Sequence, residues 1–177
     1  MSTSRTRALA AAGYGSLAVE DPCSPRVLPL LEATGLQLVP VAVDGEGLEV
    51  GALARSTARA VLVTPAHQYP TGVVLSPRRR SALAAWARDR NGLIIEDDYD
   101  AEFRYDRDPV SCVQGLTPEH VALAGSVSKT LAPGLRLGWV LAPPWLAAGL
   151  ARGRSRSLSL RSSTRAFGRR ERWSARA

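Results

Sequence analysis

Residues 124–140, with the sequence AGSVSKTLAPGLRLGWV, contain Lys129, the only lysine in a chain of 177 residues. Every other strongly basic side chain is an arginine, which stays protonated. A lysine amine, in contrast, can lose its proton when it is desolvated and can then attack a carbonyl carbon. Lys129 therefore either has a chemical role or is a surface residue in a chain whose composition favours arginine. Its neighbours must decide between the two.

The segment IIEDDYD places acidic side chains directly after a run of apolar residues. The pattern predicts a buried strand, and open α/β sheets bind ligands at the carboxyl ends of their strands. Alternation along a strand puts Asp97 and Tyr99 on one side and Asp98 on the other. A carboxylate held there can pair with a protonated ring nitrogen, and a phenol beside it can bond an oxygen on the same ring. A helix cap or a solvated loop is the alternative.

The residues around Lys129 suit a phosphate group. Ser126, Ser128 and Thr130 offer hydroxyls, and Arg136 follows in the same segment. Hydroxyls, backbone N–H groups and an arginine together can bind a phosphate. On its own, this pattern also fits a polar turn with a surface arginine.

Taken together, these features favour pyridoxal phosphate. This cofactor needs a lysine for a Schiff base, a carboxylate for its pyridinium nitrogen, and an arginine and hydroxyls for its phosphate. The carboxylate keeps the ring nitrogen protonated, so that the ring can accept electrons from the α-carbon of a substrate, and the freed lysine can move the proton. A further segment, TPAHQYPTG at residues 64–72, is by itself only a strand end followed by a Pro/Gly turn.

The hydrophobic pattern predicts an α/β domain with a mostly parallel sheet. Continuous apolar runs alternate with helical segments, which is typical of strands that are buried on both faces. The predicted strands are residues 16–21, 36–41, 60–65, 93–98, 120–126 and 136–143.

Helical patterns lie between several of these strands. One covers residues 26–34, where Pro29 weakens the prediction. A second begins with Ser76 as N-cap and Pro77 as first residue, and Gly92 can close it. The apolar face of this second helix contains Leu83, Trp86 and Ala87. A last, short helix begins in the segment PPWLAAGLA.

Cysteine content and hydropathy indicate in which cellular compartment the protein is expected. Cys23 and Cys112 are far apart and give neither a disulfide framework nor a metal-ligand spacing. The first residues lack the long apolar core of a signal peptide, and no stretch approaches the length of a membrane span. We therefore expect a cytoplasmic protein with no membrane partner.

The formal net charge of +7 is concentrated at one end of the chain. From Arg152 onward there are nine arginines and one acid, Glu171, whereas the rest has 14 basic and 15 acidic residues. The low complexity of residues 151–177 predicts a disordered tail. Such a tail can bind nucleic-acid phosphates without sequence preference, although an incidental basic tail is the favoured interpretation.

Several segments together resemble the aminotransferase-like domain of the MocR subgroup of GntR-type regulators, which is related to class I aminotransferases. The matching segments are VEDP, VPVAVDGEGL, VLVTPAHQYPTGVVLSPRRRSALAAWA, IIEDDYDAEFRYD and GSVSKTLAPGLRLGWVLAP. The resemblance runs from about residue 16 to about residue 150. It implies part of a fold-type-I large domain, a three-layer arrangement with helices on both sides of the sheet.

The resemblance also implies roles for individual residues. Lys129 corresponds to the Schiff-base lysine, Asp97 to the acid that faces the pyridine nitrogen, and Tyr99 to the phenol at the 3′-oxygen. Ser126 and Arg136 correspond to residues that hold the phosphate.

A loop and two partners follow from the same resemblance. The HQYPTG segment occupies the place of the aminotransferase NPTG turn, so that His67, Gln68 or Tyr69 should line the cofactor ring. The expected ligand is an amino acid or amine. Sites of this fold are usually built at a homodimer interface, with groups from both subunits.

The sequence departs from the family in three respects. Family members carry an N-terminal winged helix-turn-helix and a C-terminal small domain, and neither pattern is found here, so DNA binding is not expected. Ser24 stands where an aromatic residue is usual. We therefore predict an unassigned segment at 1–15, a partial large domain at 16–150 and the tail at 151–177. A non-catalytic remnant of such a regulator is the alternative to a cofactor-binding domain.

Overall fold

The computed structural model of the chain describes residues 13–98, 111–126 and 138–154. Within these residues, seven strands form one sheet in the order β3-β2-β1-β4-β5-β6-β7. The strands are β1 (Ser16–Asp21), β2 (Gln37–Asp44), β3 (Gly47–Leu48), β4 (Ala60–Val63), β5 (Leu93–Asp98), β6 (Val121–Ser126) and β7 (Gly138–Leu141). The helices are α2 (Leu28–Glu32), α3 (Val50–Arg55), α4 (Pro77–Asp89), the 3-10 helix η2 (Val113–Leu116) and α5 (Pro144–Arg154).

The centre of the sheet is parallel, as predicted. The pairs β1–β2, β1–β4, β4–β5 and β5–β6 are parallel, whereas β2–β3 and β6–β7 are antiparallel. The last predicted strand, at 136–143, is present as β7 and runs antiparallel to β6, which agrees with a mostly parallel sheet. The connecting segment 127–137 is shorter than the dozen or so residues that a parallel crossover needs.

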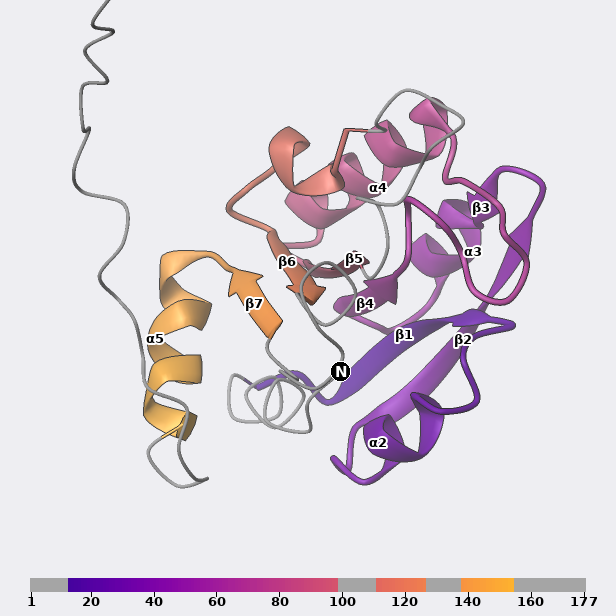
Figure 1. The fold of residues 1–177 in the computed structure, drawn as a ribbon. Coiled ribbons are helices and arrows are strands. Elements are labelled where there is room, and N and C mark those ends of the chain that lie inside the picture. The colour runs from indigo at the N-terminus through magenta and orange to yellow at the C-terminus, as the bar shows by residue number, and fades with distance from the viewer. Residues whose placement is uncertain (1–12, 99–110, 127–137, 155–177) are drawn as a thin grey trace, which may run out of the picture.

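Helices cover both faces of the sheet, so that the domain has the three predicted layers. Figure 1 shows α3 and α4 on one face and α2 and α5 on the other. Alternate strand residues contribute to the two cores: Val61 and Val63 pack with α3 and α4, whereas Ala60 and Leu62 pack with α2 and α5. Because both sides of these strands are buried, β4 is continuously apolar and β5 is apolar over its first three residues, rather than alternating.

Helix α4 begins as the sequence predicts and ends differently. The Ser76 hydroxyl accepts a hydrogen bond from the backbone N–H of Arg79 at 3.2 Å, and Pro77 is the first helical residue. At the other end, Asn91 adopts the left-handed conformation with φ of 44°, and the N–H of Gly92 donates to the carbonyl of Ala87 at 2.8 Å. This is a Schellman-type end, in which asparagine takes the place expected for glycine.

Helix α2 also differs from its prediction. It covers only Leu28–Glu32, and Pro29 lies in its first turn rather than in its interior. A proline is tolerated there because the N–H that it lacks has no helical partner at that position. Pro29 therefore does not interrupt the helix.

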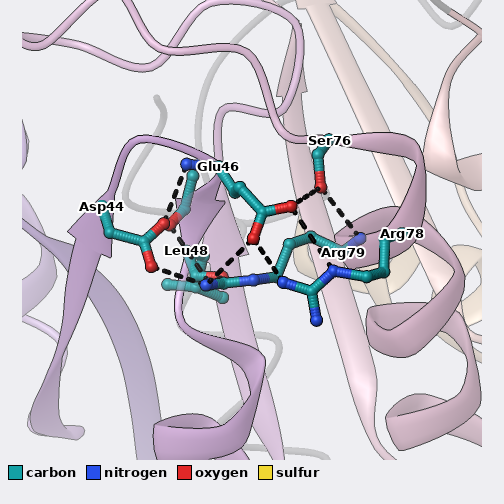
Figure 2. Close-up of polar contacts among 7 residues, drawn as sticks. Asp44, Glu46, Leu48, Ser76, Arg78 and Arg79 are labelled. Carbon is teal, nitrogen blue, oxygen red and sulfur yellow. Dashed lines mark hydrogen bonds and ion pairs between the residues drawn. The ribbon is translucent and has the colours of Figure 1, made fainter.

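The sequence analysis missed the β2–β3 hairpin and helix α3, which are short. Polar contacts fix this hairpin to the start of α4, as Figure 2 shows. Arg79 forms an ion pair with Asp44 at 2.6 Å, and Arg78 forms one with Glu46. The Ser76 hydroxyl donates to the Glu46 carboxylate at 3.1 Å. The hairpin is thus held against α4 by three side chains from the first turn of that helix or its cap.

Two buried side chains of opposite charge, Arg80 on α4 and Glu96 on β5, hydrogen-bond to the backbone of neighbouring loops. Arg80 is only 5% exposed, and its guanidinium donates to the carbonyls of Leu75 (2.9 Å), Ser111 (2.7 Å) and Pro65 (2.7 Å). Glu96, 2% exposed on β5, accepts from the backbone N–H groups of the 3-10 helix at 3.0 and 2.9 Å. The Glu96 bonds fix the 3-10 helix, and the Arg80 bond to Pro65 fixes the segment after β4, from which one wall of the candidate site is built.

Replacement of Arg80 by methionine keeps most of the apolar stem and removes the guanidinium hydrogen bonds to the carbonyls of Leu75, Pro65 and Ser111. We expect the free energy of unfolding in urea to fall by about 3 kcal/mol. The matched control is Arg88→Met, an exposed arginine on the same helix, which should cost less than about 1 kcal/mol. Equal losses for the two variants would contradict a bracing role for Arg80.

The hairpin contacts predict an acid-sensitive contribution to stability. Backbone and Arg79 hydrogen bonds lower the pKa of Asp44, and the hydrogen bonds from Arg78 and Ser76 lower the pKa of Glu46. Because these pKa values are lower in the folded chain, the contribution is complete above the ordinary carboxyl range and is lost as the pH falls through the lowered values.

Urea unfolding of the native chain and of the double variant Asp44→Asn/Glu46→Gln, measured between about pH 3 and pH 6, tests this contribution. The native chain should lose more stability on acidification than the double variant. The exposed Glu32→Gln variant is the control for loss of an acid. Parallel pH profiles for the native chain and the double variant would rule out the contribution.

Candidate functional site

The order of the strands creates a crevice at one edge of the sheet. The chain runs from β1 to β2 on one side and then returns with β4 on the other side of β1. Adjacent parallel strands that lead away in opposite directions leave space at their carboxyl ends, where open α/β sheets bind ligands. A pocket of about 410 Å³ lies at this place, lined among others by Glu20 from β1, Thr64 after β4 and Asp97 from β5.

Asp97 lies where the sequence predicts a functional acid. It is half-buried near the carboxyl end of β5 and lines the pocket. Its register partner on β6 is Ala124, and Asp98 pairs in the same way with Gly125. Ser126, the last residue of β6, is exposed at the same edge of the sheet. The two strands therefore bring an acid and a hydroxyl to neighbouring strand ends.

The three candidates in the loop after β4 have different surroundings. Tyr69 lines the pocket and is half-exposed. His67 is exposed and is not among the described residues that line the pocket. Gln68 is only 1% exposed, and its amide bonds both to the segment after β1 and to its own loop: its Nε2 donates to Pro22 O at 2.7 Å, and its Oε1 accepts from the Thr71 hydroxyl at 2.6 Å. Of the three, Tyr69 is the one placed against the pocket.

Glu20 is a residue of the site that the sequence analysis quoted but gave no role. It is 6% exposed near the end of β1, and it accepts hydrogen bonds from the backbone N–H and the hydroxyl of Thr64 at 3.2 and 2.6 Å. Burial raises the pKa of Glu20, the bonds from Thr64 and Gln68 oppose that rise, and the negative charge of Asp97 adds to it. The sequence pattern that predicted a functional role for Asp97, an acid near the end of an apolar strand, is also present at Glu20.

The segment after β1 forms the other wall of the pocket, with Cys23, Ser24, Arg26 and Val27. Ser24, which stands where the resembling family has an aromatic side chain, lines the pocket, and its carbonyl accepts from the N–H of Val27 at 3.0 Å. Burial raises the pKa of the Cys23 thiol, and the negative charges of Glu20 and Asp21 raise it further. A thiol in this state is a poor nucleophile.

Tyr99, Ser128, Lys129 and Arg136 lie outside the described residues. Their predicted roles rest on the sequence alone. Two of them are close in sequence to described strands: Tyr99 is the residue after β5, and Ser128 lies two positions beyond the end of β6.

The described groups suit a ligand that carries a positive charge and an apolar ring. Two carboxylates, Glu20 and Asp97, share a pocket with the phenol of Tyr69 and with apolar strand residues such as Val19 and Leu62. The described residues contain no group of three or more potential metal ligands. Among the described helices, none has the length and apolar character needed to cross a membrane.

The curated relatives of the chain include transcriptional regulators. It is 40% identical over 129 residues to the "Uncharacterized HTH-type transcriptional regulator YdeL" of Bacillus subtilis. It is 37% identical over 123 residues to the "Probable rhizopine catabolism regulatory protein MocR" of Rhizobium meliloti. The two matches cover 72% and 69% of this chain but 28% and 25% of those relatives. The resemblance to MocR-type regulators is therefore confirmed, and the chain spans about a quarter of the length of these relatives.

The fold is that of the aminotransferases. The kynurenine aminotransferase of Pyrococcus horikoshii superposes with a TM-score of 0.75 at 25% identity, over 86% of this chain and 42% of the enzyme. An archaeal alanine:glyoxylate aminotransferase gives a TM-score of 0.74 at 28% identity, over 87% of this chain and 40% of that one. The predicted fold class is thus confirmed. The family model "Aminotransferase class I and II" matches residues 6–168, and the chain belongs to the aminotransferase class I and II family.

Proposed function

We propose that the chain is the pyridoxal-phosphate-binding, aminotransferase-like domain of a MocR/GntR-type regulator, with the cofactor held as a Schiff base on Lys129. Proteins of this fold generally depend on pyridoxal phosphate, and the curated relatives include HTH-type regulators. The observation that carries the proposal is the position of Asp97. It is a half-buried acid near the end of a parallel strand, in a pocket at the switch point of the sheet.

The described side chains fit the cofactor. A pyridinium ring carries a positive charge and two apolar faces, and the pocket offers the carboxylate of Asp97 together with apolar strand residues. Ser126 supplies a hydroxyl at the neighbouring strand end, which suits a phosphate oxygen. In this proposal Ser128 and Arg136 complete the phosphate site, and Tyr99 binds the ring oxygen. Tyr69 lines the ring from the loop after β4.

Each residue then has a defined task. Pyridoxal phosphate supplies, when bound, an electron sink for a carbanion at the α-carbon of an amino acid. Asp97 keeps the ring nitrogen protonated, because an opposite charge at hydrogen-bond distance favours the charged form. The amine of Lys129 holds the cofactor and, once freed, accepts or returns a proton at the substrate carbon. Pocket walls from β1 and the Tyr69 segment exclude water from the ring.

The proposed ligand is an amino acid or another primary amine, since only an amine can replace Lys129 on the cofactor. Arg26, which is exposed and lines the pocket, offers a positive charge to a carboxylate of such a ligand. In a regulator this exchange would report the presence of the amine, and in an enzyme it would begin a transamination. Curated matches that include HTH-type proteins at 37–40% identity support the regulator as the proposed context.

Borohydride reduction tests the Schiff base on Lys129 directly. The purified chain is mixed with pyridoxal phosphate and reduced, and its peptides are examined by mass spectrometry. We expect a pyridoxyl group on Lys129 and loss of the visible absorbance band in Lys129→Ala. Labelling of the N-terminal amine alone, or equal labelling of native chain and variant, would refute the proposed attachment.

Asp97→Asn removes the negative charge that faces the ring nitrogen in the proposal. We expect the affinity for pyridoxal phosphate, followed by absorbance titration, to fall by about tenfold or more. Asp98→Asn is the matched control, because Asp98 is also half-buried on β5 but points to the other side of the strand. If the two variants bound the cofactor equally well, Asp97 would not be its partner.

A further inference from the structure

Glu20 is a buried acid whose place in the pocket no part of the proposed function uses. It is 6% exposed, and the three donors that the structure gives it are neutral: the N–H and hydroxyl of Thr64 and the amide of Gln68. All three bonds converge on one oxygen, Oε2. A buried carboxylate is stable only when donors replace the water that it has lost, so the loop that carries these donors is constrained to stay near β1.

The bonds to Glu20 are unequal in strength. The Thr64 hydroxyl lies 2.6 Å from Oε2 and its N–H lies 3.2 Å away, whereas Gln68 Nε2 is 3.5 Å away. That amide nitrogen has two hydrogens but three acceptors, since it also donates to Pro22 O at 2.7 Å and Tyr69 O at 3.0 Å. Thr64 is therefore the main anchor, and Gln68 is a weaker second one.

The hydrogen bonds of Gln68 connect the anchored part of the loop to Tyr69. Its side-chain oxygen accepts from the N–H and hydroxyl of Thr71 at 3.1 and 2.6 Å. Its backbone N–H donates to Val73 O at 2.9 Å, and its carbonyl accepts from the N–H of Gly72 at 2.6 Å. The loop is thus folded around a buried glutamine, which also bonds the carbonyl of the next residue, Tyr69. Displacement of Thr64 or Gln68 would displace Tyr69 with them.

We propose that Glu20 is a positioning residue of the pocket: its bonds to Thr64 and Gln68 hold residues 64–72 against the end of β1 and thereby fix Tyr69 in the pocket that Asp97 also lines. This inference rests on the proposed function for the identity of the ligand, but not for the anchoring itself. Glu20 does not touch the cofactor in this proposal, and it acts through the loop.

The alternative is that Glu20 contributes to stability without a specific effect on the loop. Burial raises the pKa of Glu20 and the negative charge of Asp97 adds to that rise, whereas the hydrogen bonds from Thr64 and Gln68 oppose it. The anchoring rests on the hydrogen bonds that converge on Oε2 of Glu20.

Hydrogen exchange measured by mass spectrometry tests the anchoring in the chain without cofactor. In Glu20→Ala, peptides that cover residues 64–73 should exchange about tenfold faster or more, because the acceptor of the hydrogen bonds from Thr64 and Gln68 is lost. Peptides from β5 and α4 should keep their native rates. Thr64→Val, which removes only the hydroxyl donor, should give a smaller increase confined to the same peptides. Glu32→Gln, an exposed acid on α2, is the matched control.

Cofactor binding supplies the second readout. The affinity for pyridoxal phosphate should fall by about tenfold in Glu20→Ala and be partly restored in Glu20→Gln, whose side-chain oxygen can still accept from Thr64. Unchanged exchange at residues 64–73 in a folded Glu20→Ala variant would overturn the inference, as would a uniform increase over all peptides. If the native chain bound no cofactor but the loop responded to Glu20→Ala, the proposed function would fail while the anchoring role stood.

Discussion

The burial of both faces of the sheet is the constraint on which the rest of this structure depends. Strands β4 and β5 are covered by α3 and α4 on one side and by α2 and α5 on the other, which favours apolar residues throughout β4 and in the first half of β5. Polar side chains are then displaced to the strand ends. Parallel pairing brings the carboxyl ends of β1, β4 and β5 to one edge, and the reversal of strand order at β1 opens a pocket there. The site is a consequence of the layer arrangement.

Buried charges fix the loops around that edge. On one side of the segment after β4, Arg80 donates to the carbonyl of Pro65. On the other, Glu20 accepts from Thr64. The two side chains, one from β1 and one from α4, thus bind adjacent residues of the same loop. Burial of either group is costly because it is desolvated. The loop residues that hydrogen-bond to it are therefore restricted to conformations that keep these bonds.

The sequence was informative wherever one physical signal dominated. Continuous apolar runs predicted the positions of β1 and β5, Ser76 and Pro77 predicted the start of α4, and an acid after an apolar run predicted the site of Asp97. The resemblance of the motifs predicted the family. Helix α3 and strand β3 were missed because elements of six and two residues carry too little periodic signal. The end of α4 was assigned to Gly92 rather than to Asn91 because either residue can adopt the left-handed conformation that closes a helix.

The candidates in the loop show a different limit. His67, Gln68 and Tyr69 are consecutive and all polar or aromatic, so sequence alone could not say which would face a ligand. In the structure, the buried amide of Gln68 has partners that are distant in the sequence: it donates to Pro22 O at 2.7 Å and, more weakly, to Glu20 at 3.5 Å. With Gln68 turned inward, Tyr69 is left to line the pocket. The partners of Glu20, Thr64 and Gln68, are also distant in the sequence, so the residues next to Glu20 did not indicate its role.

The central claim is that the pocket at the ends of β1, β4 and β5 holds pyridoxal phosphate against Asp97. The most direct measurement is a crystal structure of the chain grown with this cofactor. The account predicts density for the ring in this pocket, with the ring nitrogen about 3 Å or less from a carboxylate oxygen of Asp97 and with Tyr69 beside the ring. Density for the cofactor at another place, or in this pocket with the ring nitrogen directed away from Asp97, would contradict it.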